Sequence, residues 1–130
     1  MRNLLPGETW ALIQQQPDAL FVDVRMEIES MYVGRPPGVV NIPWYEYPVL
    51  TPDIPRFVAA IEREAGGTAR TVILICRTGQ RTVDAGIALE AAGFTDVVNV
   101  LDGFEGDLDD HQHRSTENGW RHCGLPWEQM

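Results

Sequence analysis

The chain has 130 residues, 44% of them apolar, and a formal net charge of −9 at pH 7. This length is close to that of one folded domain of roughly 150 residues, which buries about two-thirds of its unfolded surface, so we expect a single domain over residues 1–130. All ten basic residues are arginines, and nineteen acidic residues outnumber them. The resulting field opposes binding to phosphate backbones and anionic membranes, so we expect neither nucleic acid nor membrane as a partner.

The cysteine count and the N-terminal residues bear on the cellular compartment. Cys76 and Cys123 are the only cysteines, too few for the disulfide framework of a small secreted domain. Residues 1–7 contain no apolar run of the kind found in signal peptides. The longest apolar stretch, residues 72–76, is far too short to cross a membrane. These observations predict a cytoplasmic protein.

Residues 1–43 contain one predicted helix and two predicted strands. Pro6 and the acidic residue that follows mark the start of a short helix that Pro17 ends. The run 21–24 is short, apolar and rich in β-branched residues, which is typical of a buried strand. The segment 33–43 is dense in Gly and Pro, so it leaves room only for a brief strand around residues 39–41.

Residues 54–100 contain two predicted helices and two predicted strands. Apolar residues recur from Ile54 at the spacing of one helix face, and a Gly-Gly pair ends this helix after residue 65. Residues 71–75 are apolar on both faces, which predicts a central parallel strand, and residues 97–100 predict another buried strand. The composition from residue 82 to 92 is helical, with apolar residues four apart: Val83, Ile87 and Ala91.

This alternation of strands and helices predicts the fold class. It is typical of a three-layer α/β/α domain in which helices cover both faces of a central parallel sheet; we expect four or five strands. Residues 101–130 have a loop-like composition. Because functional sites in such sheets lie outside the carboxyl ends of the strands, the loop that begins at Cys76 is the first candidate site.

The loop 76–82, Cys-Arg-Thr-Gly-Gln-Arg-Thr, joins a predicted buried strand directly to a helix N-terminus. A helix start carries roughly half a positive charge and N–H groups without intrahelical partners. Arg77 and Arg81 lie close to the sulfur in sequence, and Gly79 allows successive N–H groups to point into one concavity. We expect a thiol at the rim of such a cradle to ionise below its free pKa of about 8.5 and to act as a nucleophile. The alternative, a core cysteine that ends a strand, would not need a cationic loop.

The loop resembles the active-site loop of the rhodanese family of sulfurtransferases, Cys-Arg-x-Gly-x-Arg followed by Ser or Thr. Other segments resemble this family in the same order along the chain: Asp23-Val24-Arg25 with Glu29, residues 34–43, Gly93-Phe94 and residues 100–104. The resemblance covers about residues 20–105, which we take as the core of the domain. The tail, about residues 106–130, is similar to the C-terminal extension of some single-domain bacterial members.

The resemblance implies a reaction. Cys76 would take a sulfane sulfur from a small donor such as thiosulfate or a persulfide, hold it as a persulfide, and pass it to cyanide, a thiol or a protein cysteine. The family chemistry implies neither a cofactor nor a metal. Substrate binding would fall to the residues that follow the cysteine: Arg77, Thr78, Gly79, Gln80, Arg81 and Thr82. Three residues of the early motif would support the site: Asp23, Arg25 and Glu29.

Several positions depart from the family pattern or admit a second interpretation. Arg81 either binds the anionic donor or is structural, paired to an acid such as Asp23. Arg35 and Val39 replace a His and an Ala in a supporting segment. Phe104 replaces a Gly, and it either lines the pocket or fills a gap. The loop has no lysine, the residue often associated with thiosulfate preference in the family, so the donor stays open.

The sequence also contains features of three other functions. Phosphatases and arsenate reductases place five residues between the cysteine and the arginine; here only four separate Cys76 from Arg81, so the cradle fits a sulfur atom better than a tetrahedral oxyanion. A sulfur-carrier or regulatory module with little turnover is an open alternative, because its persulfide site would look the same.

The tail contains residue types that bind metals, yet their spacing matches no closed zinc pattern: His111, His113, His122 and Cys123. Cys123 is either a resolving thiol for the persulfide or a small packing residue.

Overall fold

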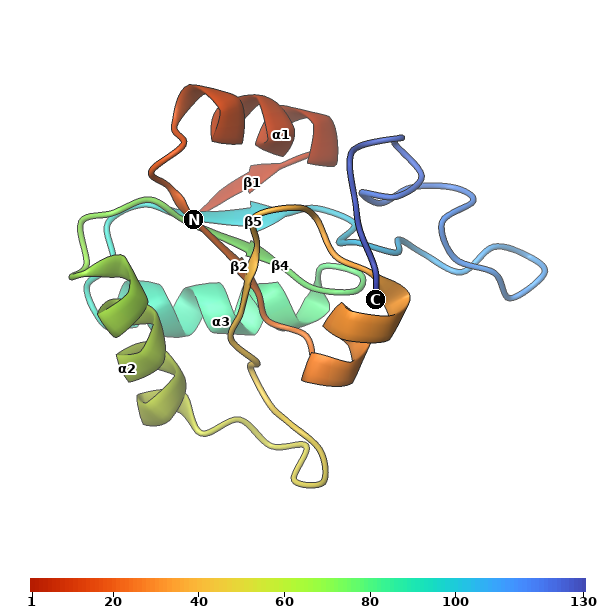
Figure 1. The fold of residues 1–130 in the computed structure, drawn as a ribbon. Helices are drawn as coiled ribbons and strands as arrows, with labels where there is room; N and C mark the ends of the chain where they lie inside the picture. Colours follow the sequence, from red (N-terminus) through yellow and green to blue (C-terminus); the bar gives the residue numbers. More distant parts are fainter.

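A computed structural model describes all of residues 1–130, and its centre is a five-stranded sheet (Figure 1). All strand pairs are parallel, in the order β1-β5-β4-β2-β3, which confirms the predicted parallel sheet. The strands are β1 (Arg2–Leu4), β2 (Leu20–Asp23), β3 (Val40–Asn41), β4 (Val72–Ile75) and β5 (Val97–Val100). The sequence pattern missed β1, because this short edge strand is largely exposed and shows no apolar alternation.

Helices cover both faces of the sheet, which confirms the three layers. The helices are α1 (Pro6–Gln15), α2 (Ile54–Ala65), α3 (Gln80–Ala91) and a short π-helix, η1 (Glu29–Val33), which the sequence pattern did not predict. Helix α1 lies on one face, and α2 and α3 lie on the other (Figure 1). Helix α3 begins two residues before the predicted start, because Gly79 adopts a left-handed conformation with φ 99° and serves as its N-cap.

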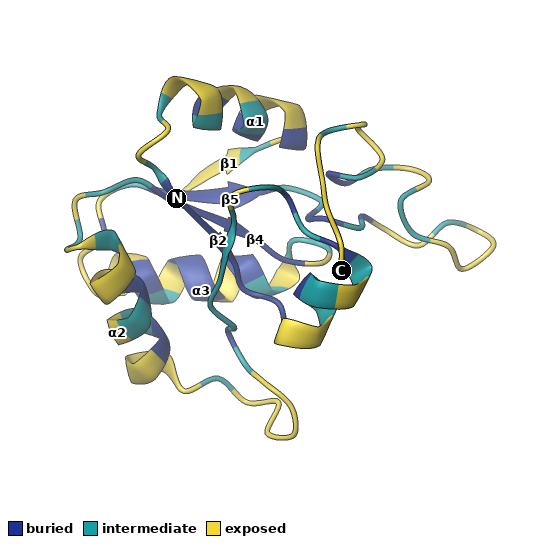
Figure 2. Cartoon of the chain, viewed as in Figure 1, coloured by how far each residue is buried: buried dark blue, intermediate teal, exposed yellow.

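The alternation of side chains along β4 divides the core into two clusters. Val72 and Leu74 pack against α2 and α3, whereas Ile73 and Ile75 pack on the opposite face with residues of α1 and the tail. All four strand residues are fully buried, as the dark strands of Figure 2 show. Cys76 continues the alternation and belongs to the same cluster as Val72 and Leu74. The sheet therefore delivers the cysteine to the face on which α3 begins.

Helix α3 buries one side and leaves apolar residues on the other. Ala85 and Leu89 are fully buried against the sheet. Two of the apolar residues that recur four apart, Val83 and Ile87, are instead 40% and 57% exposed. An apolar strip thus faces solvent directly beyond the cysteine loop.

Residues 101–130 contain no helix or strand, as predicted, but they are packed against the domain. Trp120 is fully buried, with ring centroids 5.9 Å from Trp10 and 5.6 Å from Phe21. Further along, Glu128 pairs with Arg35 through backbone hydrogen bonds of 2.8 and 2.9 Å. The packed interior therefore includes residues on both sides of the segment 20–105. No helix has the length and apolar character that a bilayer crossing requires.

Candidate active site

The sulfur of Cys76 lies against the start of α3. The Gly79 N–H donates a hydrogen bond to Cys76 Sγ at 3.1 Å, and Thr82 Oγ1 is 3.5 Å from the same sulfur. Thr82 Oγ1 also donates to the Gly79 carbonyl at 3.1 Å. A hydroxyl has one hydrogen, and here Thr82 donates it to the Gly79 carbonyl, so the Thr82 oxygen accepts a hydrogen bond from a Cys76 thiol. When Cys76 is a thiolate, the Thr82 hydroxyl can rotate and donate its hydrogen to the sulfur instead. The amide and the hydroxyl thus suit a negatively charged sulfur.

The burial of Cys76 differs from the sequence-based expectation. We expected a thiol at the rim of the loop, but the residue is only 1% exposed. The expectation was wrong because β4 runs to Ile75 with every residue buried, and Cys76 continues its inward alternation. The side chain of Cys76 is therefore almost entirely covered.

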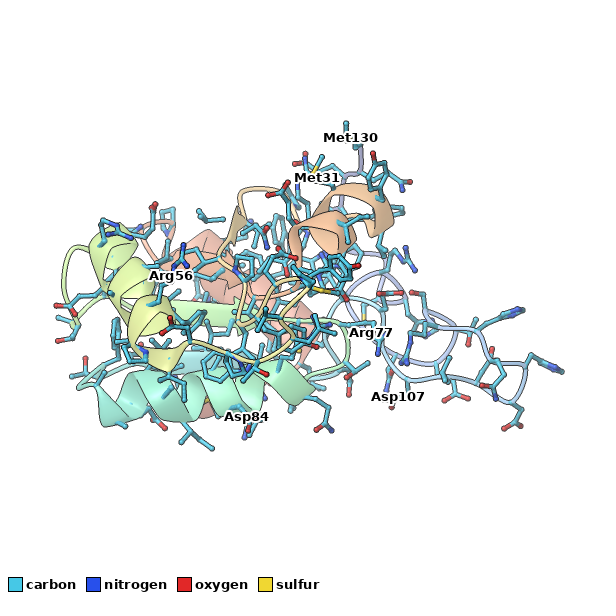
Figure 3. The ribbon with its side chains drawn as sticks, turned by 90° about the horizontal axis from the view of Figure 1, so that it is seen from below. Met31, Arg56, Arg77, Asp84, Asp107 and Met130 are labelled. Atoms are coloured by element: carbon cyan, nitrogen blue, oxygen red, sulfur yellow. The ribbon has the colours of Figure 1, made fainter.

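The other loop residues differ in their exposure. Arg77 and Gln80 are exposed, Thr78 and Gly79 are half-buried, and Thr82 is fully buried. The Arg77 guanidinium forms no ion pair. Figure 3 shows Arg77 at the end of the molecule from which the tail, with Asp107, extends. Arg77 is therefore the loop cation that is open to an anion from solution.

Arg81 is paired, and its partner is Glu29. Its Nη1 and Nη2 donate to the two carboxylate oxygens of Glu29 at 2.7 and 2.9 Å, and its guanidinium lies 5.4 Å from the Tyr45 ring. Burial opposes charge on both partners, but the paired hydrogen bonds and charges outweigh it, so the pKa of Glu29 is lowered and that of Arg81 is raised. Of the two interpretations of Arg81, this pairing favours the structural one, with Glu29 and not Asp23 as the acid.

Asp23 is unavailable to Arg81 because it is fully engaged by Arg25. Arg25 Nε and Nη2 donate to the Asp23 carboxylate at 2.9 and 2.7 Å, and both side chains are fully buried. Arg25 Nη2 also donates to the Gly34 carbonyl, and the guanidinium lies 4.7 Å from the centre of the Phe104 ring. Phe104 belongs to the core cluster on the α1 face. The Asp23–Arg25 pair therefore lies across the sheet from the sulfur.

Phe104 fills the core. It is fully buried between Arg25 and Arg121, whose guanidinium lies 5.5 Å from the ring centroid. Its backbone N–H donates to the Cys76 carbonyl at 2.8 Å. Of the two interpretations of Phe104, its burial favours gap filling.

Gly103 allows residues 103–106 to pack against the cysteine loop. A Cβ at Gly103 would lie 2.5 Å from the carbonyl carbon and oxygen of Arg77. The next residues complete the support, since the Glu105 and Gly106 N–H groups both donate to the Arg77 carbonyl. In the sequence Gly103 is visible only as part of a motif, because its close approach to Arg77 is a contact across 26 positions that no local pattern contains.

The candidate metal ligands of the tail lie on its surface. His111, His113, His122 and Cys123 are exposed. The Asp109 carboxylate accepts hydrogen bonds from the Thr116 hydroxyl and from the backbone N–H groups of His113 and His111, which lowers the pKa of Asp109. These bonds shape a turn. No group of three or more His, Cys, Asp or Glu side chains is arranged to hold a metal ion.

Fold and site define a parallel α/β domain with a cysteine at the junction of its central strand and a helix N-terminus. The model of the rhodanese-like domain matches residues 5–109, so this chain belongs to the rhodanese-like family. Among solved structures it is similar to Rv0390 from M. tuberculosis, with 37% identity, coverage of 100% of this chain and 98% of that one, and a TM-score of 0.87.

More distant relatives share the fold. The polysulfide-sulfur transferase homodimer of Wolinella succinogenes is 21% identical, with 100% of this chain and 80% of that chain covered and a TM-score of 0.66. The thiosulfate sulfurtransferase of Pseudomonas aeruginosa is 21% identical, with 99% of this chain and 20% of that chain covered and a TM-score of 0.70. The uncharacterized protein RC0915 of Rickettsia conorii is 25% identical over 134 residues, 98% of each chain. Bacteria therefore contain relatives that span nearly this whole chain.

Proposed function

We propose that this protein is a sulfurtransferase that carries a sulfane sulfur as a persulfide on Cys76. The observation that carries the proposal is the surroundings of Sγ: the Gly79 amide at 3.1 Å, at the N-terminus of α3, and the Thr82 hydroxyl at 3.5 Å. Hydrogen-bond donors and a helix N-terminus favour negative charge on sulfur. The activities named for the fold relatives of Wolinella and Pseudomonas lend the proposal further support.

The first step loads the cysteine. The Cys76 thiolate attacks the outer sulfur of thiosulfate, a new S–S bond forms, and sulfite leaves with the electron pair of the broken S–S bond. With a persulfide donor the leaving group is a thiolate. The exposed Arg77 guanidinium is suited to attract the anionic donor, while Arg81 keeps the loop in place through Glu29. Backbone N–H groups of residues 77–82 would stabilise the terminal sulfur of the product.

The second step unloads the cysteine. Cyanide or a thiolate attacks the outer sulfur of the persulfide, and the S–S bond to Cys76 breaks with its electron pair returning to Sγ. The products are thiocyanate or a new persulfide, together with the original Cys76 thiolate. Atoms and electrons balance without an external oxidant or reductant, so the cycle needs no cofactor.

The test is the mass of the intact protein before and after treatment with thiosulfate or a small persulfide. We expect a gain of one sulfur atom that cyanide removes with the release of thiocyanate. The Cys123→Ser variant is expected to gain the same mass, whereas Cys76→Ser is expected to gain none. An unchanged mass with every donor would contradict the proposal.

A second candidate function is a sulfur carrier or regulatory module that loads Cys76 without rapid turnover. The observation that favours it is the burial of Cys76, which is 1% exposed. The carrier would show loading of one sulfur per chain but no sustained release of thiocyanate under excess donor and cyanide. Multiple turnovers under the same conditions would favour the enzyme.

A further inference from the structure

An open apolar groove adjoins the cysteine loop. It lies between α3 and the segment 44–54, with a volume of about 670 Å³. Figure 1 shows this segment, in yellow, leaving the sheet and passing α3 on the way to α2. We call it the α3 groove and define it by six of its lining residues: Tyr45, Leu50, Ile54, Arg81, Asp84 and Ile87.

The α3 groove exposes more apolar surface than packing within the chain explains. Leu50, Ile54 and Ile87 are 56%, 46% and 57% exposed, although they come from the loop before α2, the start of α2 and the middle of α3. Val83, 40% exposed, extends the apolar strip on α3. Scattered exposed apolar residues are ordinary, but a contiguous group beside a reactive loop is typical of an interaction site.

The charges of the α3 groove are unbalanced. Its two charged lining residues are Arg81 and Asp84. The Glu29 carboxylate neutralises Arg81, whereas Asp84 forms no ion pair. The groove therefore carries an uncompensated negative charge on a chain whose net charge is −9. Charge complementarity favours a cationic partner and disfavours an acidic one.

The α3 groove borders the cysteine loop. Gln80 and Arg81 line it and belong to the cysteine loop. The next residue, Thr82, places its hydroxyl 3.5 Å from Cys76 Sγ. A chain segment that lies in the groove therefore lies beside Gln80 and Arg81, in the loop that covers Cys76.

We propose that the α3 groove binds a segment of the protein that receives sulfur from Cys76, an apolar segment with Lys or Arg close to its cysteine. This inference rests on the proposed function. Apolar side chains of the segment pack against Leu50, Ile54 and Ile87, and its cation pairs with Asp84. The acceptor thiolate then attacks the outer sulfur of the persulfide, the S–S bond to Cys76 breaks, and Sγ takes back its electron pair; the thiol proton goes to solvent beforehand.

The test uses the full chain loaded with sulfur and two synthetic peptides. Each peptide has one cysteine among leucines, flanked by lysines in one peptide and by glutamates in the other. Each transfer rate is divided by the rate of the same protein with cyanide, which corrects for any change in the chemistry. At low salt we expect the basic peptide to react at least about fivefold faster than the acidic one.

Charge variants connect this preference to the groove. Asp84→Lys is expected to abolish or reverse the preference for the basic peptide. The matched control is Glu62→Lys, which makes the same charge change at an exposed position of α2 outside the groove and is expected to keep the preference. Equal rates with the two peptides, or equal effects of the two variants, would overturn the inference.

Apolar variants test the packing. Ile87→Gln is expected to slow both peptides severalfold relative to cyanide, whereas Leu108→Gln, at a 44% exposed leucine of the tail, is not. If sedimentation showed a dimer that Ile87→Gln dissociates, a second copy would occupy the groove and the inference would be wrong. Failure to load sulfur or to react with cyanide would instead refute the proposed function, so the two failures are distinguishable.

Discussion

Arg81 donates two hydrogen bonds, of 2.7 and 2.9 Å, to the carboxylate of Glu29, a residue 52 positions earlier in the chain. The pair connects the first turn of α3 to the start of η1. Glu29 also accepts a hydrogen bond from the Met26 N–H at 2.8 Å, which fixes its own carboxylate. The loop that carries Cys76 is thus held on one side by the segment that follows β2 and on the other by residues 104–106.

Removal of the Cys76 sulfur is expected to abolish sulfur transfer. Cys76→Ser keeps the size of the side chain but replaces the atom that would form the persulfide, so the rate with thiosulfate and cyanide should fall to that of the uncatalysed reaction. The thermal unfolding curve should still show a cooperative transition. Cys123→Ser, at the exposed cysteine, is the matched control and should keep its activity. A Cys76→Ser protein that retains activity would refute the assignment.

The Arg81–Glu29 pair is expected to couple stability and activity. Both side chains are about one-seventh exposed, at 13% and 14%, so loss of one partner leaves the other poorly solvated. We expect Glu29→Gln and Arg81→Gln each to lower the free energy of unfolding by about 1–3 kcal/mol and to slow persulfide formation. In the double variant the two losses should not add, because both remove the same interaction. Additive losses in a urea-unfolding cycle would contradict this coupling.

The same pair predicts a dependence of stability on pH. The pKa of Glu29 is lowered from its ordinary value of 4.5 in the folded protein, so the unfolded state binds the proton more readily. The stabilisation by Glu29 is therefore complete well above pH 4.5 and is lost as the pH falls through the folded pKa. We expect the difference in free energy of unfolding between the unmodified protein and Glu29→Gln to shrink over this range. A constant difference across it would show that Glu29 is not responsible.

A side chain at Gly103 is expected to displace the cysteine loop. Gly103 has φ 65°, and an added Cβ would lie 2.5 Å from the backbone of Arg77. Gly38 is the matched control, because it has φ 76° but no atom within 4 Å of an added Cβ. Gly38→Ala should show only the backbone strain of about 1–2 kcal/mol, whereas Gly103→Ala should lose about 1–3 kcal/mol more through overpacking. Equal losses of unfolding free energy in the two variants would mean that residues around Gly103 move to accommodate the added methyl group.

Arg77 is expected to act on the donor and not on the fold. Because its guanidinium is exposed and forms no ion pair, Arg77→Ala should change the free energy of unfolding by no more than about 0.5 kcal/mol. It should raise the KM for thiosulfate severalfold, since an anionic donor loses its charged contact. Arg63→Ala, at an exposed arginine of α2, should leave KM unchanged. An unchanged KM in Arg77→Ala would exclude Arg77 from donor binding.

Local patterns in the sequence were sufficient for the architecture. Apolar runs predicted β2, β4 and β5, and the helical spacing with its closing glycines predicted α2 with the bounds that the structure has. The position of the cysteine loop at the carboxyl end of a central strand follows from the same patterns. Helices and strands form from residues that are close together in the chain, so the local periodicity of apolar residues is enough to predict them.

Tertiary structure alone decided the partners of the charged residues and the depth of the sulfur. Asp23 is the last residue of β2 and Glu29 follows that strand, yet strand alternation places Asp23 beside Arg25 on the α1 face, while η1 brings Glu29 to Arg81. The exposed side of α3 was likewise invisible in its sequence, because an apolar spacing does not say which of two apolar faces the sheet covers. Ion pairing and burial depend on which distant segments meet in the folded chain. The type of a residue indicates only which partners it can have, not which partner lies beside it.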